Sequence, residues 1–283
     1  MGDVLAGIHA TWEFESDAVV IRFERGIRTP KLFQTLRERR IPHEALASVT
    51  LAPGKRGTVV LHAVPRPGAD PLMEAAAGQL KEGRDPYRLV LPAERETLAE
   101  YYGDELRTLL TPGAGPSEGF LVAAPEGPQS FKAFDGKAIF DGSSEVSFRW
   151  FGTGASSEKW KAGDQTFSVR ELSGVEWRSP DVFDGYLRLL PRGGEPRHAQ
   201  ADRDPAAVVF GLGYGLVHES LPFAAAVLAA IRGAGRAAAP LEAERFDPAG
   251  VAERIRHLGE LHDAGLVTDE EFTAKKAELL AQL

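Results

Sequence analysis

The chain of 283 residues contains no cysteine. Without a thiol it can form no disulfide framework, has no cysteine nucleophile, and offers no thiolate ligand to a metal ion. A chain that does without disulfides suits a reducing compartment, so we expect a cytoplasmic protein. Hydrophobic residues make up 43% of the chain and charged residues 26%, which is typical of a globular protein with a substantial core.

The chain also lacks an excess of basic residues. Its net charge is −8, and acidic residues outnumber basic ones in each of the segments 1–111, 112–233 and 234–283. This balance argues against a nucleic-acid partner, because proteins that bind DNA or RNA neutralise phosphates with a basic surface. The only local basic run is Arg37–Arg40, which we interpret as a solvated loop before a strand.

No stretch of the sequence is long and apolar enough to span a bilayer. The longest apolar run, Leu221–Ile231, falls short of the roughly 20 residues that a spanning helix needs. The N-terminal sequence has no basic region followed by an apolar run, so we expect no signal peptide. These absences favour a protein that does not cross a membrane.

The two halves of residues 1–233 resemble each other. In both, three large apolar residues alternate with other residues, which places each trio on one face of a strand. The trios are Val19, Ile21 and Phe23, and Val146, Phe148 and Trp150. Further along, Ile41, Leu46, Val49 and Leu51 match Phe167, Leu172, Val175 and Trp177 at a constant offset. Aligning the glycines that precede the next strand matches Val59 and Leu61 with Leu187 and Leu189.

Each half is expected to end in a helix. The first should run over Ala93–Leu110 with an apolar stripe on one side. The stripe consists of Leu98, Tyr101 or Tyr102, Leu106, Leu109 and Leu110. The second should run over Leu221–Ile231, with Ser220 as N-cap and Gly233 as its end. Short strands followed by one helix predict an α+β fold, in which each helix covers a bent antiparallel sheet.

The first half carries an insertion, DPLMEAAAGQLKEG, before its last strand. It predicts a short helix with Asp70 as N-cap, Pro71 in the first turn and Gly83 at its end. The expected organisation is therefore a first domain over 1–111, a linker over 112–130, a second domain over 131–233, a semi-rigid linker over 234–248, and a helical hairpin over 249–283.

The hairpin is specified locally by Gly265, which fits the position after a helix end, and by the capping box Thr268–Glu271. One side of the hairpin is apolar. Because two short helices bury too little surface to be stable alone, this side predicts a partner: the preceding domain, a second copy, or another protein. The expected partner-binding residues are Ile255, Leu258, Leu261, Leu266, Phe272 and Leu279.

The stretch IRHLGELHDAGLVTDEEFTAKKAELL resembles the SHOCT family, short C-terminal domains of bacteria. The pattern is a Leu-rich helix, an acidic-Xaa-Gly turn, Thr-x-Glu-Glu-Phe, and a Lys-rich stretch with paired leucines. The matching residues are Gly265, Thr268, Glu271, Phe272, Lys275, Lys276, Leu279 and Leu280. The resemblance implies oligomerisation or targeting, and no enzymatic activity.

The front of the chain resembles the actinobacterial domain of unknown function 4429, which occurs as tandem copies before a SHOCT tail. The resemblance is carried by the opening pattern around Trp12 and Phe14, by the IP…L..V strand beginning at Ile41, and by the duplicated layout. It implies two pleckstrin-homology-like domains, each a bent antiparallel sheet closed by a C-terminal helix, again without enzymatic activity.

Motifs that carry chemistry are mostly missing. The seven histidines show no zinc-like spacing, and no Gly-x-Ser-x-Gly elbow is present. The stretch FGLGYG, residues 210–215, lacks the spacing of a dinucleotide or phosphate loop, so we interpret it as a connection. We therefore expect no catalytic residue, no cofactor and no metal. Trp160 and Phe183 lie in turn-like surroundings and are candidates for exposed contact residues.

The sequence favours a non-enzymatic binding or scaffold protein whose hairpin mediates self-association or docks a partner protein. One alternative is a module that binds lipids or a membrane surface through Arg37, Arg39 and Arg40, although the acidic balance of the chain disfavours it. A second alternative is an enzyme with a site between the domains, which would require convergent polar groups in a deep pocket.

Overall fold

The structure is a computed structural model that describes residues 3–182, 184–193, 200–211, 218–243, 256–260, 262 and 268–280. Its contacts divide the chain into two compact units, Met1–Arg232 and Gly233–Leu283. The first unit contains both halves of the duplicated region, and the second contains the C-terminal hairpin.

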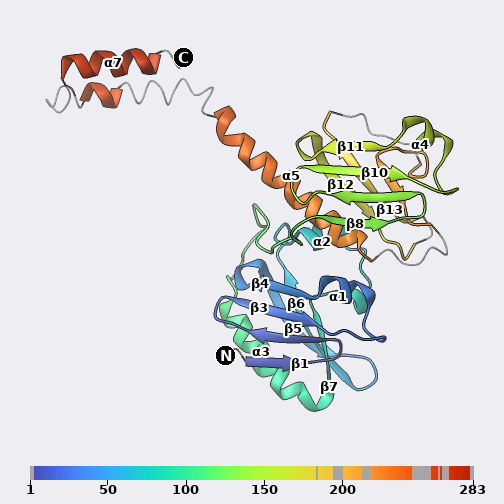
Figure 1. The fold of residues 1–283 in the computed structure, drawn as a ribbon. Helices are drawn as coiled ribbons and strands as arrows, with labels where there is room; N and C mark the ends of the chain where they lie inside the picture. Colours follow the sequence, from blue (N-terminus) through green and yellow to red (C-terminus); the bar gives the residue numbers. More distant parts are fainter. Residues whose placement is uncertain are drawn as a thin grey trace. The chain divides into compact units, whose positions relative to one another are not determined.

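The first half consists of two antiparallel sheets and a closing helix (Figure 1). The four-stranded sheet has the order β1-β2-β3-β4 and the three-stranded sheet has the order β5-β6-β7. The strands are β1 (Asp3–Ala6), β2 (Ala10–Phe14), β3 (Ala18–Phe23), β4 (Glu38–Pro42), β5 (Leu46–Pro53), β6 (Thr58–Pro65) and β7 (Arg88–Pro92). The helices are α1 (Lys31–Leu36), α2 (Pro71–Ala76) and α3 (Glu96–Leu109), with 3₁₀ turns η1 (His43–Ala45), η2 (Glu82–Arg84) and η3 (Ala93–Arg95).

The second half repeats this plan, with sheets ordered β11-β10-β9-β8 and β12-β13-β14. Its strands are β8 (Gln129–Lys132), β9 (Gly136–Phe140), β10 (Glu145–Trp150), β11 (Gln165–Ser168), β12 (Leu172–Arg178), β13 (Tyr186–Pro191) and β14 (Ala207–Val209). Its helices are α4 (Ser157–Ala162) and α5 (Ser220–Ala243), with the 3₁₀ turn η4 (Val169–Glu171). The α+β prediction and the duplication into two halves are confirmed.

Strand register corrects one part of the match between the halves. Leu51 pairs with Leu61, and its equivalent Trp177 pairs with Leu187. Leu61 and not Val59 is therefore the equivalent of Leu187, so the predicted match was wrong by two residues in this strand. The glycines that precede the two strands are not equivalent, because Gly57 lies in the loop of the β5–β6 hairpin with a φ of +70°.

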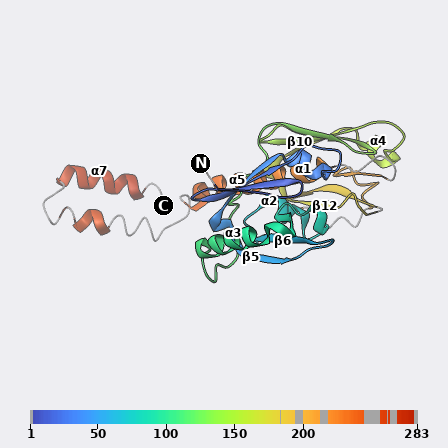
Figure 2. The ribbon, with the colours of Figure 1, turned by 90° about the horizontal axis from the view of Figure 1, so that it is seen from below.

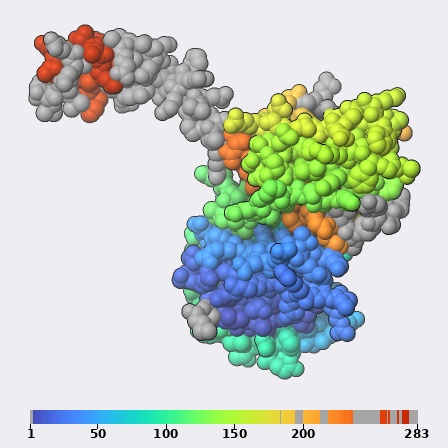
Figure 3. Space-filling model, viewed as in Figure 1, coloured from blue at the N-terminus to red at the C-terminus, as the bar shows by residue number. Residues whose placement is uncertain are grey.

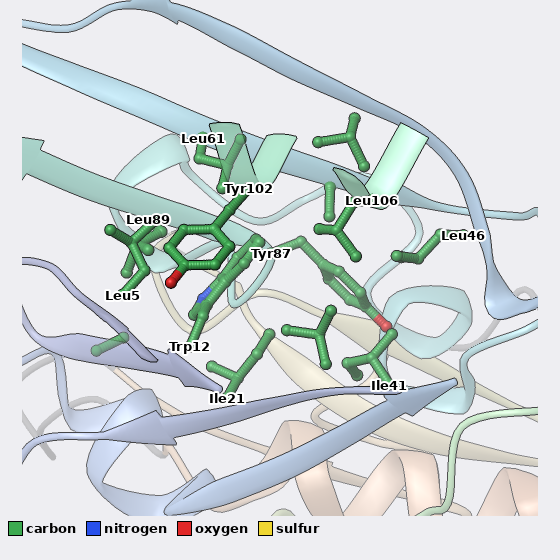
Figure 4. Close-up of a cluster of buried hydrophobic side chains, with 14 of the residues drawn as sticks. Leu5, Trp12, Ile21, Ile41, Leu46, Leu61, Tyr87, Leu89, Tyr102 and Leu106 are labelled. Atoms are coloured by element: carbon green, nitrogen blue, oxygen red, sulfur yellow. The ribbon is translucent and has the colours of Figure 1, made fainter. Parts of the chain in front are cut away.

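The core of the first half lies between its two sheets and α3, which runs along the three-stranded sheet (Figures 2 and 4). Trp12 is fully buried at its centre, and Phe14 stacks on Tyr102 of α3 with ring centroids 4.4 Å apart. The labelled core residues are Leu5, Trp12, Ile21, Ile41, Leu46, Leu61, Tyr87, Leu89, Tyr102 and Leu106. The alternating trios predicted from the sequence are buried in both halves.

The buried face of α3 differs from the predicted stripe. It is formed by Ala99, Tyr102, Gly103 and Leu106, whereas the predicted Leu98 and Leu109 are exposed. Small residues on the packed face let the helix approach the sheet closely. A Cβ added at Gly103 would lie only 3.2 Å from the Leu61 side chain.

Two predicted helix ends were wrong. Helix α2 begins as expected, with the Asp70 carboxylate accepting from the Leu72 amide at 2.9 Å, but it ends at Ala76 and not at Gly83. Ala77 adopts the left-handed conformation that terminates a helix. Helix α5 continues through Gly233 to Ala243, because glycine inside a helix costs only about 1 kcal/mol relative to alanine. Residues 234–243 of the predicted linker are thus helical.

The segment that only the first half possesses docks on the second half (Figure 1). Helix α2 packs against β12, and Gln79 beyond it donates to the Trp177 carbonyl at 2.8 Å and accepts from the Ser179 amide at 3.0 Å. Strand β12 is one of the two edge strands of its sheet. The Gln79 carboxamide therefore pairs with this edge as the peptide group of another strand would.

Charged contacts surround this docking. The Asp181 carboxylate, which is largely buried, binds both Arg84 and Lys81. On the other side of α2, Arg232 of α5 binds the Glu74 carboxylate, and its guanidinium lies 4.0 Å from the ring centroid of Phe120. Together with Gln79, these contacts join the two halves into one compact unit.

His43 opens η1 and is buried, with 7% of its surface exposed. Burial lowers the pKa of its imidazole, the Asp17 carboxylate opposes this shift, and Arg40 adds to it. Val169 opens η4 at the equivalent position and is also buried. The His43 amide donates to the Asp17 carbonyl as the Val169 amide donates to the Ser144 carbonyl, so valine fits this backbone.

Replacement of Gln79 by alanine should weaken the docking of the halves. It removes two hydrogen bonds and leaves the Ser179 amide unpaired, at a cost of about 1–2 kcal/mol. Urea unfolding measures this loss, and faster proteolysis between residues 111 and 128 reports the separation of the halves. Gln34→Ala serves as control, because the Gln34 amide donates only to Gly26 and Thr29 within the first half. Equal proteolysis rates in both variants would contradict the docking role.

Replacement of His43 by valine should reduce the pH dependence of stability. The pKa of His43 is lower in the folded chain than its ordinary value of 6.5, so protonation of the imidazole favours the unfolded chain. The neutral imidazole therefore contributes its full stabilisation above pH 6.5, and this stabilisation is lost as the pH falls through the pKa of the folded chain. The free energy of unfolding of the wild type should decrease between about pH 7 and pH 5, and H43V should decrease less.

Urea titrations at several pH values measure this difference. His257→Gln, at an exposed position, is the matched control. Burial also lowers the pKa of His218, which keeps part of the slope in every variant. The interpretation fails if H43V and the wild type show the same slope.

Candidate functional site

A cleft of about 930 Å³ lies in the first unit, lined by β4, the start of α2, residues 123–128, the start of β8, and the start of α5. The basic run Arg37–Arg40 forms one wall. The sequence interpretation of this run as a solvated loop was wrong, because Glu38–Pro42 form strand β4 and Arg39 is buried. The opposite walls carry Glu126 and Glu219.

Arg39 is neutralised inside the first half. Its two terminal nitrogens donate to the two carboxylate oxygens of Asp70 at 3.0 and 2.8 Å, and the Tyr87 hydroxyl donates to the same carboxylate at 2.7 Å. Burial disfavours the charged guanidinium and acts to lower its pKa. The adjacent Asp70 carboxylate outweighs this effect and raises the pKa of Arg39 above its ordinary value. Burial, reinforced by Asp70, likewise raises the pKa of Tyr87. These contacts fix α2 to β4.

The other two arginines of the run face outward. Arg40 binds Glu15 and Asp17, the latter at 2.7 Å. Within the described part of the chain, no carboxylate lies within ion-pair distance of Arg37. Arg39 and Arg40 are therefore neutralised by carboxylates of the first half, and this wall of the cleft does not form a concentrated positive site.

A buried ion pair in the second half replaces apolar packing in the first. Phe33 of α1 stacks on Phe23 of β3, with ring centroids 4.6 Å apart. At the equivalent positions, Lys159 of α4 lies over the ring of Trp150, with its ammonium 4.9 Å from the centroid. The Lys159 ammonium binds the Asp135 carboxylate and donates to the Ala207 carbonyl at 2.8 Å.

Both charged side chains of this pair are fully buried. Burial raises the pKa of Asp135 and lowers the pKa of Lys159, and the attraction between the two charges opposes both shifts. The second Asp135 oxygen accepts from the Val209 amide at 3.0 Å. The pair therefore holds the β8–β9 hairpin, α4 and β14 together without reaching solvent. This pair could not be predicted from the sequence, because nothing in the order of residues shows that a lysine between two exposed residues points inward.

In the described ranges, no three histidine, aspartate or glutamate side chains gather where they could hold a metal ion. In the stretch 210–215, Phe210 is buried at the end of β14 and Gly211 lies against Phe134. Residues 212–215 and His198 lie outside the described residues. None of the helices that the structure describes has the length and apolar character to cross a membrane.

Of the two predicted contact aromatics, Trp160 is 52% exposed on α4, and Phe183 lies outside the described residues. The neighbouring tryptophans behave as core residues. Trp150 and Trp177 are buried, and the Trp177 indole donates to the Ser220 hydroxyl at 2.9 Å. Trp160 therefore stands out as an exposed tryptophan beside a buried lysine.

The second unit contains helix α7 (Asp269–Leu280) and a helical stretch over 256–260. The His262 ring packs on Phe272 with centroids 4.6 Å apart, and its Nε2 lies 2.6 Å from the Asp269 carboxylate. The Lys276 ammonium lies 5.5 Å from the centroid of the Phe272 ring.

The predicted stripe of the hairpin is seen only in part. Leu258 and Phe272 are half-buried, and Leu279 belongs to α7. Ile255, Leu261 and Leu266 lie outside the described residues. The role of these residues in partner binding remains a prediction.

The buried pair Asp135–Lys159 should show strong coupling in unfolding experiments. Lys159→Met alone or Asp135→Asn alone leaves one charge buried without its counterion and should cost about 3–5 kcal/mol. The double variant should cost less than the sum of the two, as urea unfolding at neutral pH can measure. The exposed pair Arg178–Asp184 is the matched control and should show little coupling. Additive costs at Asp135 and Lys159 would contradict the pairing.

Comparison with known proteins follows the same division of the chain. The family model described as a domain of unknown function, DUF4429, matches residues 12–107 and 138–228, one segment in each half. The model of the short C-terminal domain, SHOCT, matches residues 253–280. No curated protein matches the chain. The chain belongs to the DUF4429 family, with two copies of that domain in tandem followed by a SHOCT domain.

Proposed function

We propose that the protein is a non-enzymatic binding protein, a platform of two pleckstrin-homology-like domains whose C-terminal hairpin mediates self-association. The proposal of a two-domain platform is supported by the repeated architecture. Each half consists of a four-stranded and a three-stranded antiparallel sheet closed by a helix. The two copies are joined by α2, Gln79 and the salt bridges of Asp181 and Arg232, which makes them suited to present one continuous surface.

The self-association part rests on one observation. The hairpin lies in a compact unit of its own, yet Phe272 in it is only half-buried, with the His262 ring and the Lys276 ammonium among its described neighbours. A pair of short helices has too little core to be stable without further burial of apolar surface. A second hairpin offers the same apolar stripe, and symmetric association of two copies would cover both.

Deletion of residues 249–283 should convert a self-associated protein into a monomer, because the deletion removes the apolar stripe. Light scattering or sedimentation over a range of concentrations measures the mass. Phe272→Ala should shift the same equilibrium toward the monomer without a truncation. Lys275→Ala, at an exposed position of the same helix, is the matched control. A full-length chain that is monomeric throughout the range would refute self-association.

A further inference from the structure

A row of three cationic side chains crosses the sheet of β8, β9 and β10. In the strand register, Lys132 pairs with Lys137, and Lys137 pairs with Arg149. Side chains that are paired across strands lie on the same face. Because the flanking residues Phe131 and Phe148 are buried, the cations project from the outer face of the sheet. Neighbouring strands are about 4.8 Å apart, so the three side chains start within roughly 10 Å of one another.

These cations are not compensated. Like charges directly opposite one another destabilise a sheet. Among the residues that the structure describes, no carboxylate lies within ion-pair distance of Lys132, Lys137 or Arg149. Asp164, which precedes β11 next to Arg149, instead accepts a hydrogen bond from the Trp150 amide at 3.1 Å.

The first half does not contain this row. The positions equivalent to the two lysines are Ala6 and Thr11, and Arg22 takes the place of Arg149. Arg22 binds the carboxylates of Glu13 and Glu38. In the second half, Ile139 stands at the position of Glu13. Asp164 keeps the position of Glu38 without coming within ion-pair distance of Arg149. The same sheet face thus has its arginine paired in one copy and carries three cations that are unpaired among the described residues in the other.

Two exposed aromatic rings adjoin the row. Phe134, at the tip of the β8–β9 hairpin between the two lysines, is 40% exposed. Trp160 is 52% exposed, and its neighbour Lys159 binds Asp135 of the same hairpin tip. The buried ion pair therefore holds the exposed tryptophan close to the end of the cationic row. Figure 3 shows residues 129–150 in green on the face turned to the viewer, without a helix over them.

We propose that this face, consisting of Lys132, Lys137, Arg149, Phe134 and Trp160, binds the surface of a membrane that contains anionic lipids. A flat array of cations suits an extended anionic surface, to which each lysine or arginine contributes independently. Tryptophan and phenylalanine are suited to the boundary between headgroups and acyl chains. A nucleic acid fits less well, because single strands bind in charged grooves that offer aromatic rings to successive bases, whereas these cations lie on the outer face of a sheet.

The test uses the full chain and vesicles of phosphatidylglycerol and phosphatidylcholine in equal amounts, with pure phosphatidylcholine vesicles for comparison. The wild type should bind the anionic vesicles more tightly, and added salt should weaken the binding. The variant K132Q/K137Q/R149Q should lose about a hundredfold in affinity, as expected for three cations at an anionic surface. Trp160→Ser should also weaken binding.

The control variant R25Q/R28Q/K55Q removes the same charge from exposed positions of the first half and should bind like the wild type. Thermal unfolding confirms that the variants fold, and Trp160→Ser provides an independent test if the triple variant does not. The proposal is overturned if the wild type shows no preference for anionic vesicles or if the control loses as much affinity as the triple variant. Binding to an oligothymidine strand without binding to vesicles would also overturn it.

Discussion

The arrangement of the duplicated region depends on one sheet edge. Strand β12 is an edge strand of its sheet, and an uncovered edge presents unpaired amides and carbonyls that can pair with another chain. The first half covers this edge with α2 and the carboxamide of Gln79. Asp70 joins the same insertion to β4 through Arg39, so the docking segment is anchored in its own half. The insertion that contains α2 and Gln79 therefore packs within the first half and also covers the β12 edge of the second half.

The two copies share a backbone plan but distribute their charges differently. The first places a buried Arg39–Asp70 pair beside its insertion and balances the charges on its outer sheet face. The second places Lys159 and Asp135 in its interior and leaves the outer face positive. The sheets and turns of the two copies are equivalent, so one backbone plan accommodates two different arrangements of charge. The buried pairs stabilise each copy with different partners, and the outer sheet faces differ in charge.

Much of the fold could be predicted from the sequence because apolar residues recur with the period of a strand or a helix. Val146, Phe148 and Trp150 are an example, and all three are buried. Helix ends were less predictable, since Gly233 is tolerated inside a long helix while Ala77 ends a short one in a left-handed conformation. Each depends on packing that the local sequence does not report.

Features that depend on contacts between distant segments escaped prediction. Lys132, Lys137 and Arg149 are far from consecutive in the sequence, with Asp135, Asp141 and Glu145 among the residues between them, and only the antiparallel register brings them into one row. The run of consecutive basic residues lies instead at Arg37–Arg40, where Arg39 and Arg40 form ion pairs within the first half. Gln79 gave no signal either, because its partners, Trp177 and Ser179, lie in the other half.

The Gln79 contact is also specific to the edge that it covers. It requires an amide at Ser179, and the equivalent position on β5 is Pro53, which has no amide hydrogen. The nearby Val49 carbonyl is already taken by Arg107 of α3 at 2.9 Å. A glutamine docked on β5 in the same way would therefore lack one of the two hydrogen bonds that Gln79 makes. The contact thus distinguishes the β12 edge from the otherwise equivalent β5 edge.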